Sequence, residues 1–308
     1  MLLFFFMHIY YYKKNVMIIK KGSKGNDVKN IQEFLGLKSD GFFGNDTERK
    51  VIEYQRKMGL SPDGMVGDET MESMGLFTSD NSETTYVVGD LKVKKYYLPK
   101  GEYYGGPTDK EYLFLHHTAG WHNPYNQVDQ WGRDGRGKIA TEFLIGGQSV
   151  KGDSDDYDGE VLQCIPKGGY AWHLGKNGSQ YMHTNSVGIE VCNFGQLTNG
   201  KTYAGTSVVD SQVCKLNQPF RGFNEYHKYS NEQLKSLANL IKHIGDRDNI
   251  EIRDGLISEI RKKGVSGFDY NEDAFYGKVK GMWTHTNTRK DKNDMYPCES
   301  LIDMLLSL

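Results

Sequence analysis

The sequence is poor in the features that mark several large protein classes. Only four of its 308 residues are cysteines, and they are widely scattered without a Cys-x-x-Cys pair. This spacing is not that of a disulfide framework or of a structural zinc knuckle. The formal net charge is −2 and there is no polybasic run. Neither nucleic acid nor an anionic membrane is therefore the expected partner.

No apolar run is long enough to span a bilayer. Residues 1–12 are apolar and aromatic, but a transmembrane helix needs about 20 such residues. The stretch also lacks the positive start and the small-residue cleavage site of a secretory signal. Because a well-formed pattern begins at Met17, we interpret residues 1–16 as a dispensable tail or a mis-called start. A chain of this length has room for two domains.

A repeated glycine turn organises residues 17–76. The sequence DGFFGNDT at 40–47 recurs as DGMVGDET at 63–70, and each copy ends in a threonine suited to capping a helix. Apolar residues at helical spacing lie before the first turn, at 27–35, and between the two turns, at 47–58. The pattern predicts a small all-α domain of three short helices.

This unit resembles the peptidoglycan-binding domain found beside many cell-wall hydrolases. The matching positions include Gly22, Gly25, Val28, Ile31, Gln32, Tyr54, Gln55 and the two turns. The resemblance covers nearly all of residues 18–75 and implies that this domain binds the cell wall. The alternative is a generic helical module with glycine turns.

The remainder, residues 93–308, has the pattern of an α+β domain, with a mixed central sheet flanked by helices. Residues 77–92 are polar and without a clear period, which favours a linker. Short strands are expected at 112–115, 141–145, 160–165 and 186–192. Ser230 begins a helix, with Gln233 in the capping-box position. Residues 196–228 and 247–280 show little pattern and are interpreted as loops or insertions.

Polar residues that suit a zinc site occur at two distant places. The strand ending at Leu115 runs directly into His116 and His117, and a third histidine, His285, precedes Asp294. Two histidines and a carboxylate suit a zinc ion that keeps a fourth position for water, whose pKa zinc lowers to roughly 7. The spacing alone leaves open that these are ordinary loop residues.

Glu190 is an acidic residue inside an apolar strand. Burial of a carboxylate is costly unless it is paired or functional. Beside a metal site, it would take a proton from water and pass it to a leaving amine. The alternative is an inward-facing salt bridge or a carboxylate at the strand end.

Together these stretches resemble the zinc-dependent N-acetylmuramoyl-L-alanine amidase family of phage endolysins, autolysins and peptidoglycan-recognition proteins. The matches follow the family's order: His116-His117-Thr118-Ala119, Thr141-Glu142-Phe143-Leu144-Ile145, Ala171-Trp172-His173-Leu174-Gly175, Asn185-Ser186-x-Gly188-Ile189-Glu190, and His285 with Lys292-x-Asp294. The resemblance spans about 95–308, without the two insertions.

The resemblance implies a role for each matched residue. The implied zinc ligands are His116, His285 and Asp294, with Glu190 as general base and Lys292 as the cation that stabilises the oxyanion. Substrate contacts are expected from His117, Trp172, His173 and Asn185. Alternation along the strand places His117 on the face opposite His116, which favours His116 as the ligand.

Two departures from the family's pattern leave alternatives open. Many members carry an aromatic or histidine pair where this chain has Thr141-Glu142, so Glu142 is a candidate for part of the catalytic role. Some members use cysteine as the third zinc ligand, at the position that Asp294 occupies here. Cys298, four residues further on, is therefore a rival ligand.

The resulting hypothesis is a monomeric peptidoglycan hydrolase that cleaves the amide between N-acetylmuramic acid and L-alanine. Its first domain would anchor it on the wall, and tethering raises the local substrate concentration. A phage endolysin released from the host cytoplasm fits the absent export signal, and secretion by another route is the alternative. The rival functions are a non-catalytic peptidoglycan-binding protein and a zinc peptidase that acts on the stem peptide.

Overall fold

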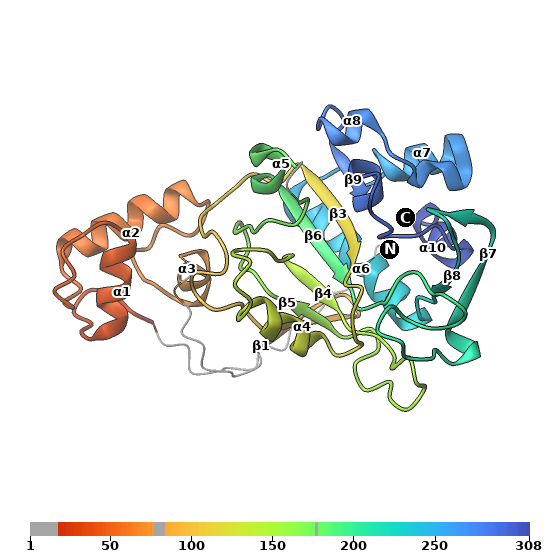
Figure 1. Ribbon diagram of the computed structural model, residues 1–308. Helices are drawn as coiled ribbons and strands as arrows, with labels where there is room; N and C mark the ends of the chain where they lie inside the picture. The colour runs from red at the N-terminus through yellow and green to blue at the C-terminus, as the bar shows by residue number, and fades with distance from the viewer. Residues whose placement is uncertain (1–17, 75, 77–83, 176–177) are drawn as a thin grey trace, which may run out of the picture. The chain divides into compact units, whose positions relative to one another are not determined.

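The chain divides near residue 77 into two compact units. The computed structural model describes residues 18–74, 76, 84–175 and 178–308 (Figure 1). The expected tail at residues 1–16 lies outside the described residues.

The first unit is helical, as predicted. It contains α1 (Asn26–Phe34), α2 (Asn45–Lys57) and α3 (Asp68–Ser73). The apolar faces of these helices meet in a core that includes Val28, Ile31, Phe43, Val51 and Val66.

Two buried glutamines, 23 residues apart, hold the two repeated turns in the same way. The side-chain amide of Gln32 donates to Asp40 Oδ1 at 2.8 Å, and its carbonyl accepts from the Gly41 amide at 2.8 Å. Gln55 makes the equivalent bonds in the second turn at 3.1 and 2.9 Å. Gly41 and Gly64 have φ of 75° and 72°, where a residue without Cβ is favoured. The repeat therefore includes the glutamines as well as the glycines.

The second unit is built on a seven-stranded mixed sheet, which confirms the expected α+β fold. The strand order is β1-β2-β5-β4-β6-β3-β9. The bounds are β1 (Thr84–Val88), β2 (Leu91–Lys95), β3 (Tyr112–His117), β4 (Phe143–Ile145), β5 (Val161–Gln163), β6 (Ser186–Val191) and β9 (Gly281–Thr284). Strands β1 and β2 are antiparallel, as are β4 and β5, and the other neighbours are parallel.

The linker expected over residues 77–92 is too long. Residues 84–88 form the edge strand β1, and Leu91 begins β2, which pairs with it. The polar sequence misleads because β1 lies at the edge of the sheet, where polar residues are tolerated. Residues 77–83 lie outside the described residues.

Helices cover the sheet, and the longest of them is α6 (Asn231–Asp248). Ser230 and Gln233 form the predicted capping box, and the apolar side chains of α6 are buried: Leu234, Leu237, Leu240, Ile241 and Ile244. The other helices are α4 (Pro124–Trp131), α5 (Gln180–Thr184), α7 (Leu256–Lys263), α8 (Glu272–Phe275), α9 (His285–Thr288) and α10 (Glu299–Leu306). No helix in the described part of the chain combines the length and apolar character needed to cross a membrane.

The two stretches expected to be loops contain regular structure. The first holds the 3-10 turn η1 (Asp210–Gln212) and a hairpin of β7 (Val213–Phe220) with β8 (Phe223–His227). The second holds the end of α6, α7, η2 (Gly264–Phe268) and α8. The turns η1 and η2 and helix α8 are too short to show a period, and β7 is half exposed and contains a proline. Helix α7 does carry apolar residues at helical spacing, Leu256, Ile257 and Ile260, which the prediction of a loop overlooks.

Strand β3 is buried along its whole length and separates two parts of the core. Leu113 and Leu115 pack into the cluster that contains α6, α7 and α10. Tyr112 and Phe114 pack on the other face, with Trp283 of β9. The alternation continues to the strand end, where it determines the sides on which the two histidines lie.

Candidate functional site

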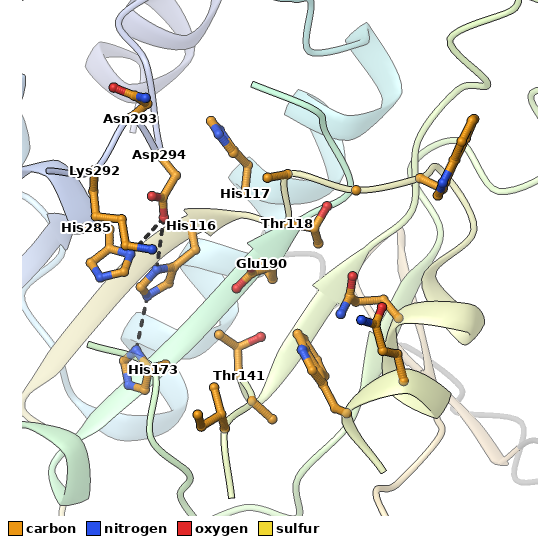
Figure 2. Close-up of a pocket in the computed structure, with 18 of the residues that line it drawn as sticks. His116, His117, Thr118, Thr141, His173, Glu190, His285, Lys292, Asn293 and Asp294 are labelled. Atoms are coloured by element: carbon orange, nitrogen blue, oxygen red, sulfur yellow. Dashed lines mark hydrogen bonds and ion pairs between the residues drawn. The ribbon is translucent and has the colours of Figure 1, made fainter. Parts of the chain in front are cut away.

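Three parallel strands end at one edge of the sheet and bring distant residues together. In the pairing of β3 with β6, His116 lies opposite Glu190. In the pairing of β3 with β9, Leu115 lies opposite Thr284, so His285 follows directly beside His116. The carboxyl ends of parallel strands commonly carry the ligand site of such a sheet. Figure 2 shows the side chains of His116, Glu190 and His285 around one cavity.

The carboxylate of Asp294 lies between two imidazoles. Its Oδ2 is 2.9 Å from Nδ1 of His285 and 3.3 Å from Nδ1 of His116 (Figure 2). All three residues are buried. Within the described ranges, this is the one group of three or more histidine, cysteine or carboxylate side chains whose donor atoms lie within 4.8 Å of one another.

The donor set fits a zinc ion. Zinc bonds of about 2.0–2.2 Å in a tetrahedral site place neighbouring donor atoms roughly 3.3–3.6 Å apart, close to the spacing observed here. Burial lowers the pKa of His116 to about 4, so its imidazole is neutral, as metal binding requires. Burial alone would raise the pKa of Asp294, but the adjacent His285 and His116 more than offset it, and the pKa lies well below its ordinary value. The site thus offers a neutral imidazole and an ionised carboxylate.

The second ring nitrogen of His116 is held by another histidine. His116 Nε2 is 3.1 Å from Nδ1 of His173 (Figure 2). Nε2 of His173 is in turn 2.8 Å from Oγ of Ser186. The backbone amide of His173 donates to Nδ1 of His183 at 3.2 Å. Burial and the neighbouring His116 lower the pKa of His173 well below its usual value. A chain of neutral side chains therefore orients His116.

Glu190 is a half-buried carboxyl that faces the same cavity. Burial raises its pKa to about 8, and the charge of Asp294 adds to the shift. The cations Lys292 and Arg136 act in the opposite direction. A group whose pKa lies near neutrality is suited to both accepting and returning a proton.

Lys292 comes from the loop that ends at Asp294, and it lines the cavity. Among the described residues, its ammonium has no hydrogen-bond or ion-pair partner. A flexible, unpaired cation beside the donor set is suited to binding a developing negative charge.

The cavity has a volume of about 630 Å³. Besides the residues above, His117, Thr141, Trp172 and His173 line it. His117 also reaches the other face of the sheet, where its Nδ1 is 2.9 Å from the hydroxyl of Tyr229. Eight of the nine sequence-predicted site residues therefore lie around one cavity.

Asn185 is the predicted site residue that the structure does not bring to the cavity. It precedes the first residue of β6, whereas Glu190 lies near the strand's other end. Its side-chain amide donates to the backbone carbonyl of Asp109 at 2.6 Å. This hydrogen bond connects the backbone at Asp109 to the start of β6.

The two alternative participants also lie away from the cavity lining. Glu142 is buried against α6, where its carboxylate accepts from the guanidinium of Arg247 at 2.6 and 3.2 Å. Cys298 is buried at the N-terminus of α10, with Sγ 3.5 Å from Oγ of Ser300. The neighbour of Glu142, Thr141, lines the cavity instead.

Arg221 supports the site from a stretch that the sequence analysis interpreted as a loop. It lies in the turn between β7 and β8, and its guanidinium donates to the carbonyls of Lys290 at 2.9 Å and Thr286 at 3.1 Å. Both carbonyls belong to the segment that immediately precedes Lys292. No sequence pattern predicts contacts from an arginine to distant backbone carbonyls, so this residue was missed.

Two protein-family models match the chain. Residues 106–294, more than half of the chain, match the model described as N-acetylmuramoyl-L-alanine amidase. Residues 24–74 match the model of a peptidoglycan binding domain. The first matched range includes His116, His285 and Asp294, and the second includes both repeated turns.

Three solved structures are similar to parts of the chain. A fused Zn-dependent amidase/peptidase/peptidoglycan-binding protein from Clostridium acetobutylicum is 35% identical over 21% of this chain and 32% of its own, with a TM-score of 0.20. The amidase AmiD from E. coli is 18% identical over 48% of each chain, with a TM-score of 0.31. A mutant endolysin from Bacillus subtilis is 16% identical over 53% of this chain and 80% of its own, with a TM-score of 0.33. The match spans about a third of the C. acetobutylicum protein and about half of AmiD.

Proposed function

The chain belongs to the N-acetylmuramoyl-L-alanine amidase family, and we propose that it hydrolyses the amide bond between N-acetylmuramic acid and L-alanine in peptidoglycan. The first unit would hold the enzyme on the wall, as its match to a peptidoglycan binding domain suggests. The observation that carries the proposal is the convergence of His116, His285 and Asp294 at a single cavity that Glu190 also lines.

Zinc is the cofactor of this family, and His116, His285 and Asp294 are the residues that would hold it. Bound zinc would supply Lewis acidity, which makes water a usable nucleophile at neutral pH. Two imidazoles and one carboxylate leave a tetrahedral ion one position for a small molecule, the arrangement of a catalytic rather than a structural site.

The remaining steps belong to residues of the chain. Glu190 would accept a proton from the attacking water and return it to the departing amine of L-alanine. The ammonium of Lys292 would bind the oxyanion that develops on the scissile carbonyl. Trp172 lines the cavity where the substrate would lie. One chain supplies the whole set, which fits the proposed monomer.

The cell wall is the proposed place of action. A phage endolysin released from the host cytoplasm fits the pairing of an amidase with a wall-binding domain. Secretion by another route is the alternative.

Digestion of purified sacculi tests the proposal. Zinc-loaded protein should release peptides that begin at L-alanine without generating new reducing ends, and Glu190→Gln should retain the metal but release far less. Binding to sacculi without release would favour a non-catalytic wall-binding protein. Fragments cut within the stem peptide, identified by mass spectrometry, would favour a peptidase.

A further inference from the structure

Part of the cavity wall is aromatic and carries no charge. Trp121 and Tyr203 both line the cavity, with 46% and 73% of their surfaces exposed. The buried ring of Phe194 joins them, with centroid distances of 5.1 Å to Trp121 and 5.9 Å to Tyr203. Large aromatic rings exposed beside a catalytic cavity mark a place where a ligand packs. We call Trp121, Phe194 and Tyr203 the aromatic wall.

Unpaired carboxamides line the same cavity. Asn126, Gln127 and Gln130 come from α4, and Gln196 comes from the segment that also carries Tyr203. Among the described residues, none of these four side chains has a hydrogen-bond partner. Asn123 provides the contrast, because its side chain accepts from the Tyr125 and Asn126 amides and caps α4. The four free carboxamides offer donors and acceptors without charge.

The charged side chains that line the cavity come from other segments than α4 and the segment after Gly195. Lys292 and Asp291 come from the loop that ends at the metal-ligand candidate Asp294, and the charge of Arg136 acts on Glu190. A ligand segment that carries carboxylates, such as a stem peptide, would be drawn to these cations. The aromatic wall with its carboxamides suits an uncharged ligand segment instead.

We propose that the aromatic wall and the four carboxamides form a subsite for the glycan strand, on the sugars next to the muramic acid whose amide is cleaved. A pyranose ring presents a C–H face that packs on an aromatic ring, and its hydroxyl and acetamido groups exchange hydrogen bonds with carboxamides. The inference rests on the proposed function, because it places a neighbouring part of the same substrate. It also assigns a role to the segment after Gly195, which carries Gln196 and Tyr203.

The subsite favours polymerised glycan over a single muropeptide. A monomer fills the positions around the metal-ligand candidates but leaves the aromatic wall uncovered, whereas a strand covers both. The additional contacts add binding energy without touching the reacting amide, so they affect KM for the strand rather than kcat.

Kinetics on two substrates test this inference. The zinc-loaded full chain and its Tyr203→Ala and Trp121→Ala variants are compared on peptide-bearing glycan strands and on a single muramoyl peptide. We expect each variant to raise KM for the strands about tenfold, with kcat and the monomer KM changed less than twofold. Tyr276→Ala is the matched control, because Tyr276 is 64% exposed and lies next to α8, outside the cavity lining. An equal rise in KM for both substrates, or no rise for the strands, would overturn the subsite.

A binding measurement separates this inference from the proposed function. Peptide-free glycan strands contain no amide for the enzyme to cleave, so calorimetry reports binding alone. The Tyr203→Ala chain should bind them more weakly than both the unmodified chain and Tyr276→Ala. Weaker binding together with no hydrolysis of any substrate by the unmodified chain would retain the subsite and reject the amidase. Unchanged binding together with normal hydrolysis would reject the subsite and retain the amidase.

Discussion

His116 Nε2 and His173 Nδ1 lie 3.1 Å apart, so the partner of one neutral imidazole is another neutral imidazole. Histidines that bind metals usually donate their second ring N–H to a carboxylate, a backbone carbonyl or water. When Nδ1 of His116 binds metal, its Nε2 carries the proton and donates to Nδ1 of His173. His173 then donates from Nε2 to Ser186 at 2.8 Å. The hydrogen bonds thus select the tautomer that His116 needs.

Removal of this partner should weaken metal binding. We expect His173→Ala to lower zinc affinity about 10–100-fold, the usual effect of losing the residue that orients a metal ligand. Competition with a chromophoric chelator measures the affinity directly, without depending on turnover. The control is His243→Ala, since His243 is a half-buried histidine of α6. Equal affinities in the two variants would mean that His173 does not orient His116.

The choice between Asp294 and Cys298 as third ligand can be decided by metal content. The structure places Asp294 Oδ2 against both histidines and Cys298 at the start of α10. His285→Ala and Asp294→Ala should therefore lose stoichiometric zinc, while Cys298→Ser should retain it. Elemental analysis of the purified variants measures this. Loss of zinc from Cys298→Ser with a normal circular dichroism spectrum would contradict the assignment.

The parts that the sequence predicts well are those governed by local pattern. The apolar run that ends in His116 becomes β3, and the capping box at Ser230 begins α6 as expected. Strand alternation also separates His116 from His117, whose Nδ1 contacts Tyr229 on the opposite side of the sheet. Period and capping are properties of neighbouring residues, so one sequence reveals them.

The parts that the sequence does not predict depend on contacts between distant segments. The guanidinium of Arg221 binds carbonyls of a loop far along the chain, and a backbone carbonyl has no side-chain signature. Asn185 belongs to a matching motif, yet it lies at the wrong end of β6 to reach the cavity. Glu142 follows Thr141, but only the threonine lines the cavity. Packing decides which way a side chain points and which group it contacts. A sequence motif alone does not record this.

Glu142 should contribute to stability rather than to turnover. Its carboxylate is buried and forms a two-point contact with Arg247, which also pairs with Asp248. We expect Glu142→Gln to destabilise the fold by about 1–3 kcal/mol, because it removes one of the two buried carboxylates that pair with the Arg247 guanidinium and leaves only Asp248. Urea unfolding measures the loss. A fully stable variant with reduced kcat would instead return Glu142 to the catalytic set.

Glu190 should make the stability of the metal-free protein depend on pH. Burial, with a contribution from Asp294, raises its pKa from 4.5 to about 8 in the folded state. The folded chain therefore holds the proton more tightly than the unfolded chain does. The stabilising contribution of protonated Glu190 is complete below about pH 4.5 and is lost progressively as the pH rises to about 8.

Comparison with Glu190→Gln isolates this effect, since the other titrating groups are common to both proteins. We expect the stability of the chelator-treated variant, relative to the unmodified chain, to increase from pH 5 to pH 8 and then to level off. Urea unfolding at half-unit pH intervals measures the difference. A constant difference would mean that Glu190 titrates near its ordinary pKa. Zinc should lower the pH at which the stability difference levels off, because a dication beside the carboxylate of Glu190 favours its ionised form. An ionised Glu190 could then accept a proton at neutral pH.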